Sequence, residues 1–309
     1  MRVLFWGTPA FALPALRALG EEGHHLVGVV TQPDRPAGRG RGLAASPVKR
    51  AAIEEGLPIL QPERARGEEF LDQIRALDPE ISVVVAFGQI LRPEVLYLPP
   101  RGSVNIHASL LPELRGAAPI QWAIIRGYET SGVSIMRMDE GLDSGPVLFQ
   151  VHEPIRPDEA AGDLAMRLSE IGAEALIETL AMLEIGHLEE IPQDHARASY
   201  APKLSRETAR LDWTLPAIEV ARWIRGLDAV PGASSLLDGE ETVKLFHPRV
   251  ELREGPPGEV LAADEEVGVL IAAGQNAVRV REVQPAGRRR MLAEEWIRGR
   301  GVALGQRFS

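Results

Sequence analysis

The amino-acid sequence predicts an α/β fold in which a doubly wound, mostly parallel sheet is followed by a small C-terminal β-barrel. In the first half of the 309-residue chain, short apolar runs alternate with stretches of helical spacing, which is typical of parallel strands joined by crossover helices. One of these runs, Val83 to Ala86, is apolar throughout and therefore suits a sheet covered on both faces. Towards the C-terminus the pattern changes to short β-like runs separated by DG, PPG and GQN turn signals, which fit an antiparallel barrel.

The elements of the first domain follow from this alternation in chain order. The pattern predicts strands over Arg2 to Trp6, His25 to Val30, Ile81 to Ala86 and Ser103 to Ile106, and helices over Ala10 to Leu19 and Ala117 to Arg126. Two further runs, Val133 to Met138 and Pro146 to Val151, predict a strand pair around a turn. The segment Glu159 to Leu183 carries apolar residues near helical spacing and predicts a long amphipathic helix.

We place the domain boundaries where this pattern breaks. Residues 1–187 form the predicted first domain, residues 188–205 a polar linker that contains Pro192 and Pro202, and residues 206–309 the C-terminal domain. The C-terminal domain begins with a helix that has Pro216 in its first turn. Its predicted strands are Ser234 to Leu237, Thr242 to Phe246, Val267 to Ala272 and Ala277 to Val283.

Composition narrows the class of protein. Apolar residues make up 45% of the chain and charged residues 25%, which is ordinary for a globular protein. The chain has no cysteine, which excludes disulfides, thiolate metal sites and cysteine nucleophiles. The N-terminal apolar run is too short for a signal peptide, and no later apolar run reaches membrane-spanning length, so we expect a cytoplasmic protein with no membrane partner.

The distribution of charge points to contacts with phosphates. The net charge of −10 argues against binding nucleic acid over the whole surface. Gln32 to Arg50, however, has five basic residues against one acidic, and Arg279 to Ser309 has eight against three. Prolines and glycines in the first stretch predict a loop without regular structure over residues 31–49. Such a loop is either functional or a solvated insertion, and composition leaves both open.

Candidate catalytic residues lie at the end of a predicted strand. Asn105 and His107 are two positions apart, so in an extended chain their side chains project to the same side. Together they would combine an oxyanion donor with a proton carrier. A purely structural pair has the same spacing. Asp143 lies in a glycine-bounded acidic loop that could place a carboxylate beside His107, although an ordinary hairpin turn has this pattern too. The other six histidines are scattered, so we expect no metal site.

The first strand is followed by a turn that does not match a dinucleotide site. The dinucleotide fingerprint needs three glycines, and only Gly7 is present. Thr8 as the N-cap and Pro9 as the first helical residue explain the turn structurally. We therefore expect neither a nicotinamide nor a flavin cofactor.

Longer stretches resemble the methionyl-tRNA formyltransferase family along essentially the whole chain. The matching text is FWGTPAFALPALRAL, TQPDRPAGRGRGL with SPVK, VVVAFGQIL, NIHASLLPELRGAAPIQWAI, MDEGLDSGPV, KLSRETARLDW and IRGLDAVPGA. The combination of Asn105, His107, the SLLP sequence and Asp143 is shared by the wider group of formyltransferases that use 10-formyltetrahydrofolate. The arginine loop after the second strand distinguishes the tRNA-directed family within that group.

The resemblance implies a Rossmann-like formyltransferase domain and an OB-like domain that supports tRNA. It implies formyl transfer from 10-formyltetrahydrofolate to the α-amino group of methionine on initiator methionyl-tRNA, a step of translation initiation, by a protein that we expect to be a monomer. Asn105, His107 and Asp143 match the catalytic set. The positions that hold the folate match Ser109, Leu110, Leu111, Pro112, Phe87, Gly88, Gln89, Ile90 and Leu91. The positions expected to contact tRNA are Arg35, Arg39, Arg41, Lys203, Arg288, Arg289 and Arg290.

Three other functions remain open at this point. The same catalytic residues could formylate an amino sugar nucleotide, although a soluble sugar nucleotide gives no reason for three arginines on one loop. The chain could instead be a tRNA-binding homologue without turnover, against which the intact Asn105, His107 and Asp143 argue. Hydrolysis of the formyl donor without an amine acceptor is the third.

Overall fold

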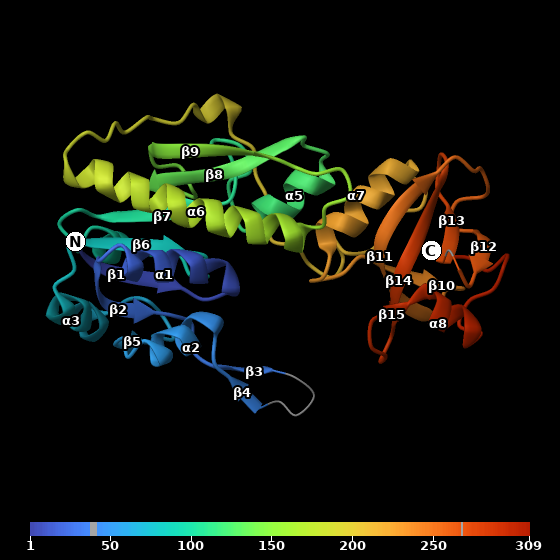
Figure 1. The fold of residues 1–309 in the computed structure, drawn as a ribbon, viewed down its shortest axis with the longest axis horizontal. Helices are drawn as coiled ribbons and strands as arrows, with labels where there is room; N and C mark the ends of the chain where they lie inside the picture. The colour runs from blue at the N-terminus through green and yellow to red at the C-terminus, as the bar shows by residue number, and fades with distance from the viewer. Residues whose placement is uncertain (38–41, 267) are drawn as a thin grey trace. The chain divides into compact units, whose positions relative to one another are not determined.

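The computed structural model describes residues 1–37, 42–266 and 268–309 (Figure 1). The chain divides into two compact units, each built from several segments. The N-terminal unit contains Met1–Gly116, Ser131–Glu153 and Ala165–Tyr200. The C-terminal unit contains Ala117–Thr130, Pro154–Leu164 and Ala201–Ser309.

The N-terminal unit is built on the predicted, mostly parallel sheet. Its strands are β1 (Arg2–Gly7), β2 (His25–Val30), β5 (Ile59–Leu60), β6 (Ile81–Val85), β7 (Ser103–His107), β8 (Thr130–Arg137) and β9 (Val147–Pro154). The spatial order is β5-β2-β1-β6-β7-β8-β9. Pairing is parallel from β5 to β7 and becomes antiparallel between β7 and β8. The carboxyl ends of the parallel strands therefore share one edge, where ligands bind in sheets of this kind.

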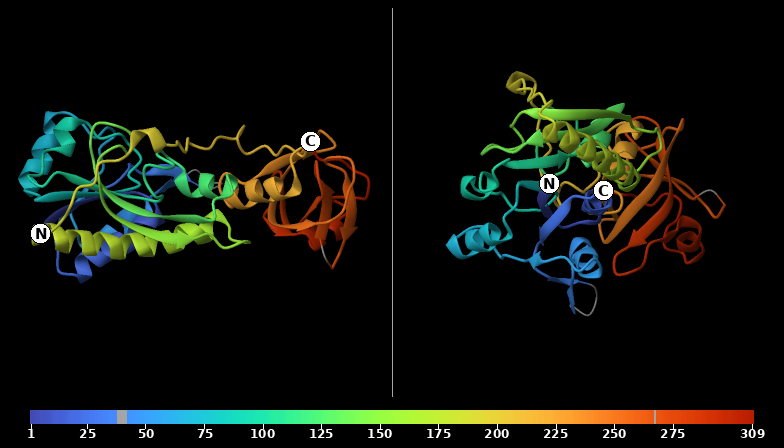
Figure 2. Two further views of the ribbon diagram at one scale, coloured as in Figure 1. Left: turned by 90° about the horizontal axis from the view of Figure 1, so that it is seen from above. Right: turned by 60° about the vertical axis from the view of Figure 1, so that its left-hand side comes forward.

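Helices cover both faces of this sheet, which confirms the doubly wound architecture. The helices are α1 (Leu13–Glu21), α2 (Pro47–Glu54), α3 (Glu68–Leu77), α4 (Pro93–Leu96) and α6 (Ala161–Glu184). α3 and α4 pack on one face through a core around Trp6, whose ring meets Phe70 and Phe87 edge to face. α1 and α6 lie on the other face (Figures 1 and 2), where α6 approaches β7 closely at Gly172, beside Ile106. Every residue of β6 is buried, as the apolar run predicts.

The C-terminal unit has the predicted antiparallel sheet. After α7 (Ala217–Leu227) come β10 (Ser234–Leu237), β11 (Glu241–Glu251), β12 (Val260–Asp264), β13 (Gly268–Ala272), β14 (Ala277–Pro285), β15 (Met291–Leu292) and α8 (Ala293–Arg298). The strand order is β10-β11-β14-β13-β12, and β15 pairs with β14. Leu237 bridges Phe308 and Glu259 bridges Arg307, so the C-terminal residues bond both edges of the sheet and close it. Closure leaves fewer unpaired backbone groups at the edges.

Two segments that precede residue 187, Ala117–Thr130 and Pro154–Leu164, group with the C-terminal unit, although we predict a first domain that continues to residue 187. Residues 117–130 include α5 (Pro119–Ile125), which packs against α7. Ile125 belongs to the apolar core of the C-terminal unit, and a Cβ at Gly226 would lie 2.6 Å from it. α5 has the spacing of an ordinary crossover helix, so the sequence does not reveal which core it joins.

The basic loop over residues 31–49 is more regular than predicted. Residues on either side of 38–41 form a two-stranded hairpin, β3 (Arg35–Ala37) and β4 (Gly42–Ala44). α2 then begins at Pro47, where the Ser46 hydroxyl accepts a hydrogen bond from the backbone of Lys49 and caps the helix. The prediction of an unstructured loop was wrong because prolines are compatible with a short edge hairpin.

The turn after β1 also differs from the prediction. Thr8 does not cap the helix; its hydroxyl donates to the carbonyl of Phe87 instead. The helical segment begins with a short 3₁₀-helix at Ala10–Ala12, for which Pro9 is the N-cap, and continues directly into α1. Thr8 thus ties the ends of two neighbouring strands together.

Among the described residues, no helix is long and apolar enough to cross a bilayer.

Closure of the C-terminal sheet generates a stability prediction. Phe308 is buried and packs on Trp213, with 5.9 Å between ring centroids. Phe308→Ala should lower the free energy of unfolding by about 3–5 kcal/mol, as for other large-to-small core substitutions, measured by chemical denaturation. Leu304→Ala, at a nearby exposed position, is the matched control. An equal, small effect of both substitutions would contradict the closure.

Candidate active site

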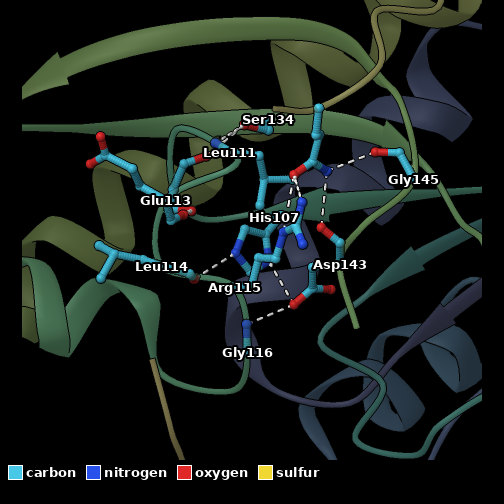
Figure 3. A network of polar contacts seen from close by, with 11 residues as sticks. His107, Leu111, Glu113, Leu114, Arg115, Gly116, Ser134, Asp143 and Gly145 are labelled. Carbon is cyan, nitrogen blue, oxygen red and sulfur yellow. Dashed lines mark hydrogen bonds and ion pairs between the residues drawn. The ribbon is translucent and has the colours of Figure 1, made fainter. Parts of the chain in front are cut away.

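The predicted catalytic residues come from two neighbouring parts of the N-terminal unit. Asn105 and His107 lie on β7, where Asn105 pairs with Val84 on one side and Met136 on the other. Two positions apart on a strand, their side chains share a face of the sheet. Asp143 lies in the turn between β8 and β9, and its Oδ2 is 3.7 Å from His107 Nδ1 (Figure 3). The structure thus brings Asp143 to the imidazole, as expected.

The backbone around His107 determines which of its ring nitrogens can act. The imidazole is buried, with 6% of the side chain exposed. Its Nε2 lies 3.0 Å from the carbonyl oxygen of Leu114. Because a carbonyl oxygen can only accept, Nε2 carries a hydrogen and donates it there. Nδ1, which faces Asp143, is therefore the nitrogen that can gain or lose a proton.

Asp143 is held in place from two sides. Its Oδ2 accepts a hydrogen bond from the backbone N–H of Gly116 at 2.7 Å, and its backbone has a positive φ of 48°. The turn is folded by Asp139, whose carboxylate accepts from the Ser144 hydroxyl. A Cβ at Gly145 would lie 2.0 Å from the Arg137 carbonyl oxygen, so this glycine is required. Asp139 therefore stabilises the turn, and Asp143 is the carboxylate of this turn that faces His107.

A buried amide that sequence analysis missed fixes the same turn. Gln193 lies in the predicted linker, and its Nε2 donates to the carbonyls of Asp143 at 2.9 Å and Gly145 at 2.7 Å. Its Oε1 accepts from Arg115 at 3.1 Å and 2.6 Å, through Nε and Nη2 of a guanidinium that is itself buried. Arg115 lies between Leu114, which holds His107, and the Gly116 N–H (Figure 3). Nothing in the composition of the linker indicates this role.

The predicted folate-binding residues of the SLLP sequence follow β7 and are held by side chains of β8 and β9. Ser134 donates its hydroxyl to the carbonyl of Ser109 at 2.6 Å and accepts from the backbone of Leu111 at 3.0 Å. The Gln150 amide donates to both the Leu111 carbonyl and Ser134. Leu110 and Pro112 complete the segment. This segment therefore has a defined shape beside His107.

The second predicted folate-binding stretch has mixed surroundings. Phe87 and Leu91 are buried in the core around Trp6, and Gly88 has a positive φ of 90°. Gln89 braces the backbone at residues 63–65, whereas Ile90 is 89% exposed. Gln89 and Ile90 line a cavity of about 390 Å³ together with Arg64, Arg66 and Arg92. An exposed apolar side chain beside three cations suits a ligand that is both apolar and anionic.

The predicted tRNA-binding residues are dispersed. Arg39 and Arg41 lie outside the described residues, and Arg35 on β3 is exposed. Lys203, Arg288 and Arg289 are exposed, and Arg289 pairs with Glu295. Arg290 has internal partners: it pairs with Asp228 and Glu282 and stacks on the Phe246 ring.

Among the described residues, no group of three or more histidine, aspartate and glutamate side chains is arranged to hold a metal ion.

Comparison with known proteins identifies the class to which this fold and site belong. The model of the formyl transferase family matches residues 1–180, and the model of the formyl transferase C-terminal domain matches residues 203–301. Among solved structures, the sugar 3N-formyl transferase WlaRD has a TM-score of 0.68 at 16% identity, covering 94% of this chain and 99% of its own. HypX from Aquifex aeolicus has a TM-score of 0.68 at 22% identity, and this chain spans 47% of it. At these identities the likeness shows the fold alone.

Full-length relatives narrow the class to one family. A methionyl-tRNA formyltransferase of Geobacter sulfurreducens is 45% identical over 100% of this chain and 96% of its own length. One from Symbiobacterium thermophilum is 46% identical over 100% of this chain and 95% of its own. The chain belongs to the methionyl-tRNA formyltransferase family. A structure of such an enzyme from Clostridium thermocellum has a TM-score of 0.58 at 17% identity, covering 83% of this chain and 95% of its own.

The bonds of Gln193 generate a prediction about positioning. Gln193→Leu keeps the size of the side chain but removes its bonds to the carbonyls of Asp143 and Gly145 and to Arg115. We expect the single-turnover rate of formyl transfer to fall about 10- to 100-fold, because small displacements of catalytic groups cost that much, with a smaller change in KM. Gln284→Leu, in the C-terminal unit, is the control. An unchanged rate in folded Gln193→Leu would assign Gln193 a structural role only.

Proposed function

We propose that this protein transfers the formyl group of 10-formyltetrahydrofolate to the α-amino group of methionine on initiator methionyl-tRNA. The reaction is a direct acyl transfer through a tetrahedral oxyanion. The observation that carries the proposal is the placement of Asn105, His107 and Asp143 at the ligand-binding edge of the sheet, in a chain about 45% identical over its full length to enzymes named for this activity. The sugar formyltransferase, by comparison, is 16% identical.

The amide of Asn105 would stabilise the oxyanion. No hydrogen-bond partner of this side chain lies in the described part of the chain, and the residue is half-buried. A donor that is fixed on a strand and has no internal partner can bond an oxygen that becomes negative in the transition state at little cost in reorganisation. This supports the role of Asn105 as the oxyanion donor.

The His107–Asp143 pair would move the proton. As the amine attacks the formyl carbon it must lose a proton, and the departing folate nitrogen must gain one. Asp143 can accept the proton from the amine directly or through water, His107 Nδ1 can exchange it with Asp143, and His107 Nδ1 can then pass a proton to the departing folate nitrogen. His107 Nε2 is committed to Leu114, so a direct bond from Nε2 to the formyl oxygen is disfavoured.

The donor would occupy the edge formed by the two folate-binding segments. Ser109 to Pro112, held by Ser134, would contact the folate next to the catalytic residues. Phe87 to Leu91 would form the wall near the pterin. The cavity beside Gln89 and Ile90, with its arginines, is suited to the anionic glutamate portion of the donor. We expect no metal, nicotinamide or flavin to take part in this reaction.

The remaining predictions follow the same proposal. Residues 1–187 would form the catalytic domain, residues 188–205 the linker and residues 206–309 the domain that supports tRNA. The segment over residues 31–45, which contains Arg35, Arg39 and Arg41 in the sequence, would engage the acceptor stem, and Lys203 and Arg288 to Arg290 would contact tRNA elsewhere. We infer a cytoplasmic monomer. A single-turnover assay with the formyl donor and charged tRNA separates transfer from donor hydrolysis, from tRNA binding without turnover and from sugar formylation.

The proposed oxyanion contact generates a prediction about turnover. Asn105→Ala should lower turnover on initiator methionyl-tRNA about 10²- to 10³-fold, the usual effect of removing one oxyanion donor. Asn105→Asp keeps the shape but replaces the donor by an acceptor, so it should be at least as slow. Unfolding midpoints equal to wild type are the control for folding. Undiminished formylation by either variant would remove Asn105 from the mechanism.

The arginines of the segment over residues 31–45 generate a prediction about tRNA binding. Arg41→Ala should raise the KM for tRNA, and the slope of log affinity against log salt should become shallower by nearly one unit per lost phosphate contact. The measurement is tRNA affinity at several salt concentrations. Arg17→Ala, at an exposed position on α1, should leave the slope unchanged. A wild-type slope in Arg41→Ala would assign Arg41 to the solvated surface, and altered discrimination among tRNAs would indicate base contacts.

A further inference from the structure

A cavity in the C-terminal unit has no part in the proposed reaction. Its volume is about 350 Å³, within the range for small-molecule sites. It lies where the segment before α6 and the end of α7 meet β11 and β14. Every described residue that lines it belongs to the C-terminal unit, whereas Asn105, His107 and Asp143 belong to the N-terminal unit. The cavity is therefore distinct from the candidate active site.

Three arginines bring positive charge to this cavity. They are Arg225 on α7, Arg249 on β11 and Arg281 on β14. The Arg225 guanidinium is half-buried and donates to the carbonyl oxygen of Glu159 at 3.2 Å. Within residues 1–37, 42–266 and 268–309, the side chains of Arg249 and Arg281 have neither a hydrogen-bond nor an ion-pair partner. Their donors are therefore available to a ligand.

Two of the carboxylates beside these arginines are bonded to another cation. Asp228 pairs with Arg290 at 2.8 Å, and Glu282 pairs with the same guanidinium. Glu282 Oε1 also lies 3.6 Å from His247 Nε2. Asp158 is the third carboxylate that lines the cavity, and it is exposed. A single exposed carboxylate does not neutralise three guanidinium groups.

The surroundings of Arg225 leave its charge incompletely compensated. Burial is the strongest influence on this guanidinium and lowers its pKa. Asp158 opposes this effect, and Arg222 adds to it. Arg249 and Arg281, on two paired strands, bring like charge to the same cavity. An anion in the cavity would therefore stabilise all three of its arginines.

The lining side chains select a phosphate ester as the anion. A guanidinium offers parallel N–H donors that can bond two phosphate oxygens at once. A phosphate monoester carries roughly two negative charges at neutral pH, which suits several cations in one cavity. Pro248 and Leu292 add apolar surface to the lining, against which a compact organic group can pack. The ligand is then a small molecule that carries a phosphate.

The carboxylates of the cavity favour an isolated phosphate over a nucleic-acid backbone. In RNA each phosphate is a diester with one negative charge, and it has phosphate neighbours on both sides. A backbone that entered the cavity would bring these neighbours towards Asp158, Asp228 and Glu282, and like charges repel. A small monoester avoids this repulsion and carries more charge on its one phosphate.

We propose that this cavity binds the phosphate monoester group of a small molecule, with Arg225, Arg249 and Arg281 bonding the phosphate and Pro248 and Leu292 contacting the organic part. This gives the C-terminal unit a ligand site of its own. The inference is independent of the proposed function, because formyl transfer requires no group in this cavity.

The test measures binding of two aromatic phosphates to the full-length protein by isothermal titration calorimetry at low ionic strength. Phenyl phosphate is a monoester, and methyl phenyl phosphate is a diester with the same ring. We expect saturable one-to-one binding of phenyl phosphate and binding of the diester that is about tenfold weaker or more. Arg249→Gln and Arg281→Gln should each weaken the binding of phenyl phosphate about tenfold, because each removes a charge-assisted hydrogen bond.

Matched variants separate binding from folding. Arg253→Gln, at an exposed position after β11, should bind phenyl phosphate as wild type does. Arg225→Gln should weaken binding at least as much as Arg281→Gln, provided that its unfolding midpoint equals that of wild type. Because Arg225 also bonds the Glu159 carbonyl, the exposed Arg249 and Arg281 keep the test decisive if Arg225→Gln does not fold.

Three results would overturn the proposal. The first is the absence of saturable binding of phenyl phosphate, and the second is equal affinity for the monoester and the diester. The third is wild-type affinity for phenyl phosphate in both Arg249→Gln and Arg281→Gln. If these variants instead weaken tRNA binding and flatten its salt dependence while phenyl phosphate does not bind, the arginines belong to an RNA-binding surface. The formylation assay with charged tRNA tests the proposed function separately.

Discussion

The candidate active site depends on three consecutive residues, Leu114 to Gly116, that bond both members of the His107–Asp143 pair. The Leu114 carbonyl accepts from His107 Nε2, and the Gly116 N–H donates to Asp143 Oδ2. Between them, Arg115 reaches through Gln193 to the backbone of the acidic turn. One short segment thus sets the tautomer of the imidazole and the position of the carboxylate. Any proton transfer between them then occurs in a geometry that is fixed before substrate binds, which is the condition for efficient general acid–base catalysis.

The buried guanidinium in this segment has a physical explanation. A buried charge is stable only when its donors are bonded, and Arg115 is bonded to the Gln193 amide and to His195 rather than to a carboxylate. A carboxylate at position 193 would pair with Arg115 but would also stand against the carbonyls of Asp143 and Gly145. The neutral amide offers an acceptor to the arginine and donors to the carbonyls at once. It also leaves Asp143 as the carboxylate that faces the imidazole.

Much of the fold and the centre of the site follow from local patterns in the sequence. Strand periodicity places Asn105 and His107 on one side of β7, and the glycines around Asp143 predict the turn, because both depend only on neighbouring residues. Gln193 could not be found in this way, since its partners lie some 50 residues away in the chain, as the bonds to Asp143 and Gly145 show. The same limit explains α5, whose apolar face is evident but whose partner, α7, is decided by tertiary packing. The hairpin after β2 was missed because prolines and glycines mark edge strands and loops alike.

Internal ion pairs reduce the number of free cations in the two basic stretches of the sequence. Eight basic residues in Arg279 to Ser309 suggest a strongly attractive surface. Arg279, however, is bonded to Glu251, Arg290 to Asp228 and Glu282, and Arg289 to Glu295. Cations that are paired within the fold release fewer counterions when a phosphate approaches. Similarly, in the Gln32 to Arg50 stretch, Lys49 is paired with Asp34, and hydrogen bonds from Lys49 and Gln61 hold the pKa of that half-buried carboxyl below its usual value. Because the net charge is −10, long-range attraction of an RNA must come from local groups of arginines, and the positions of these groups rather than the total charge determine where it docks.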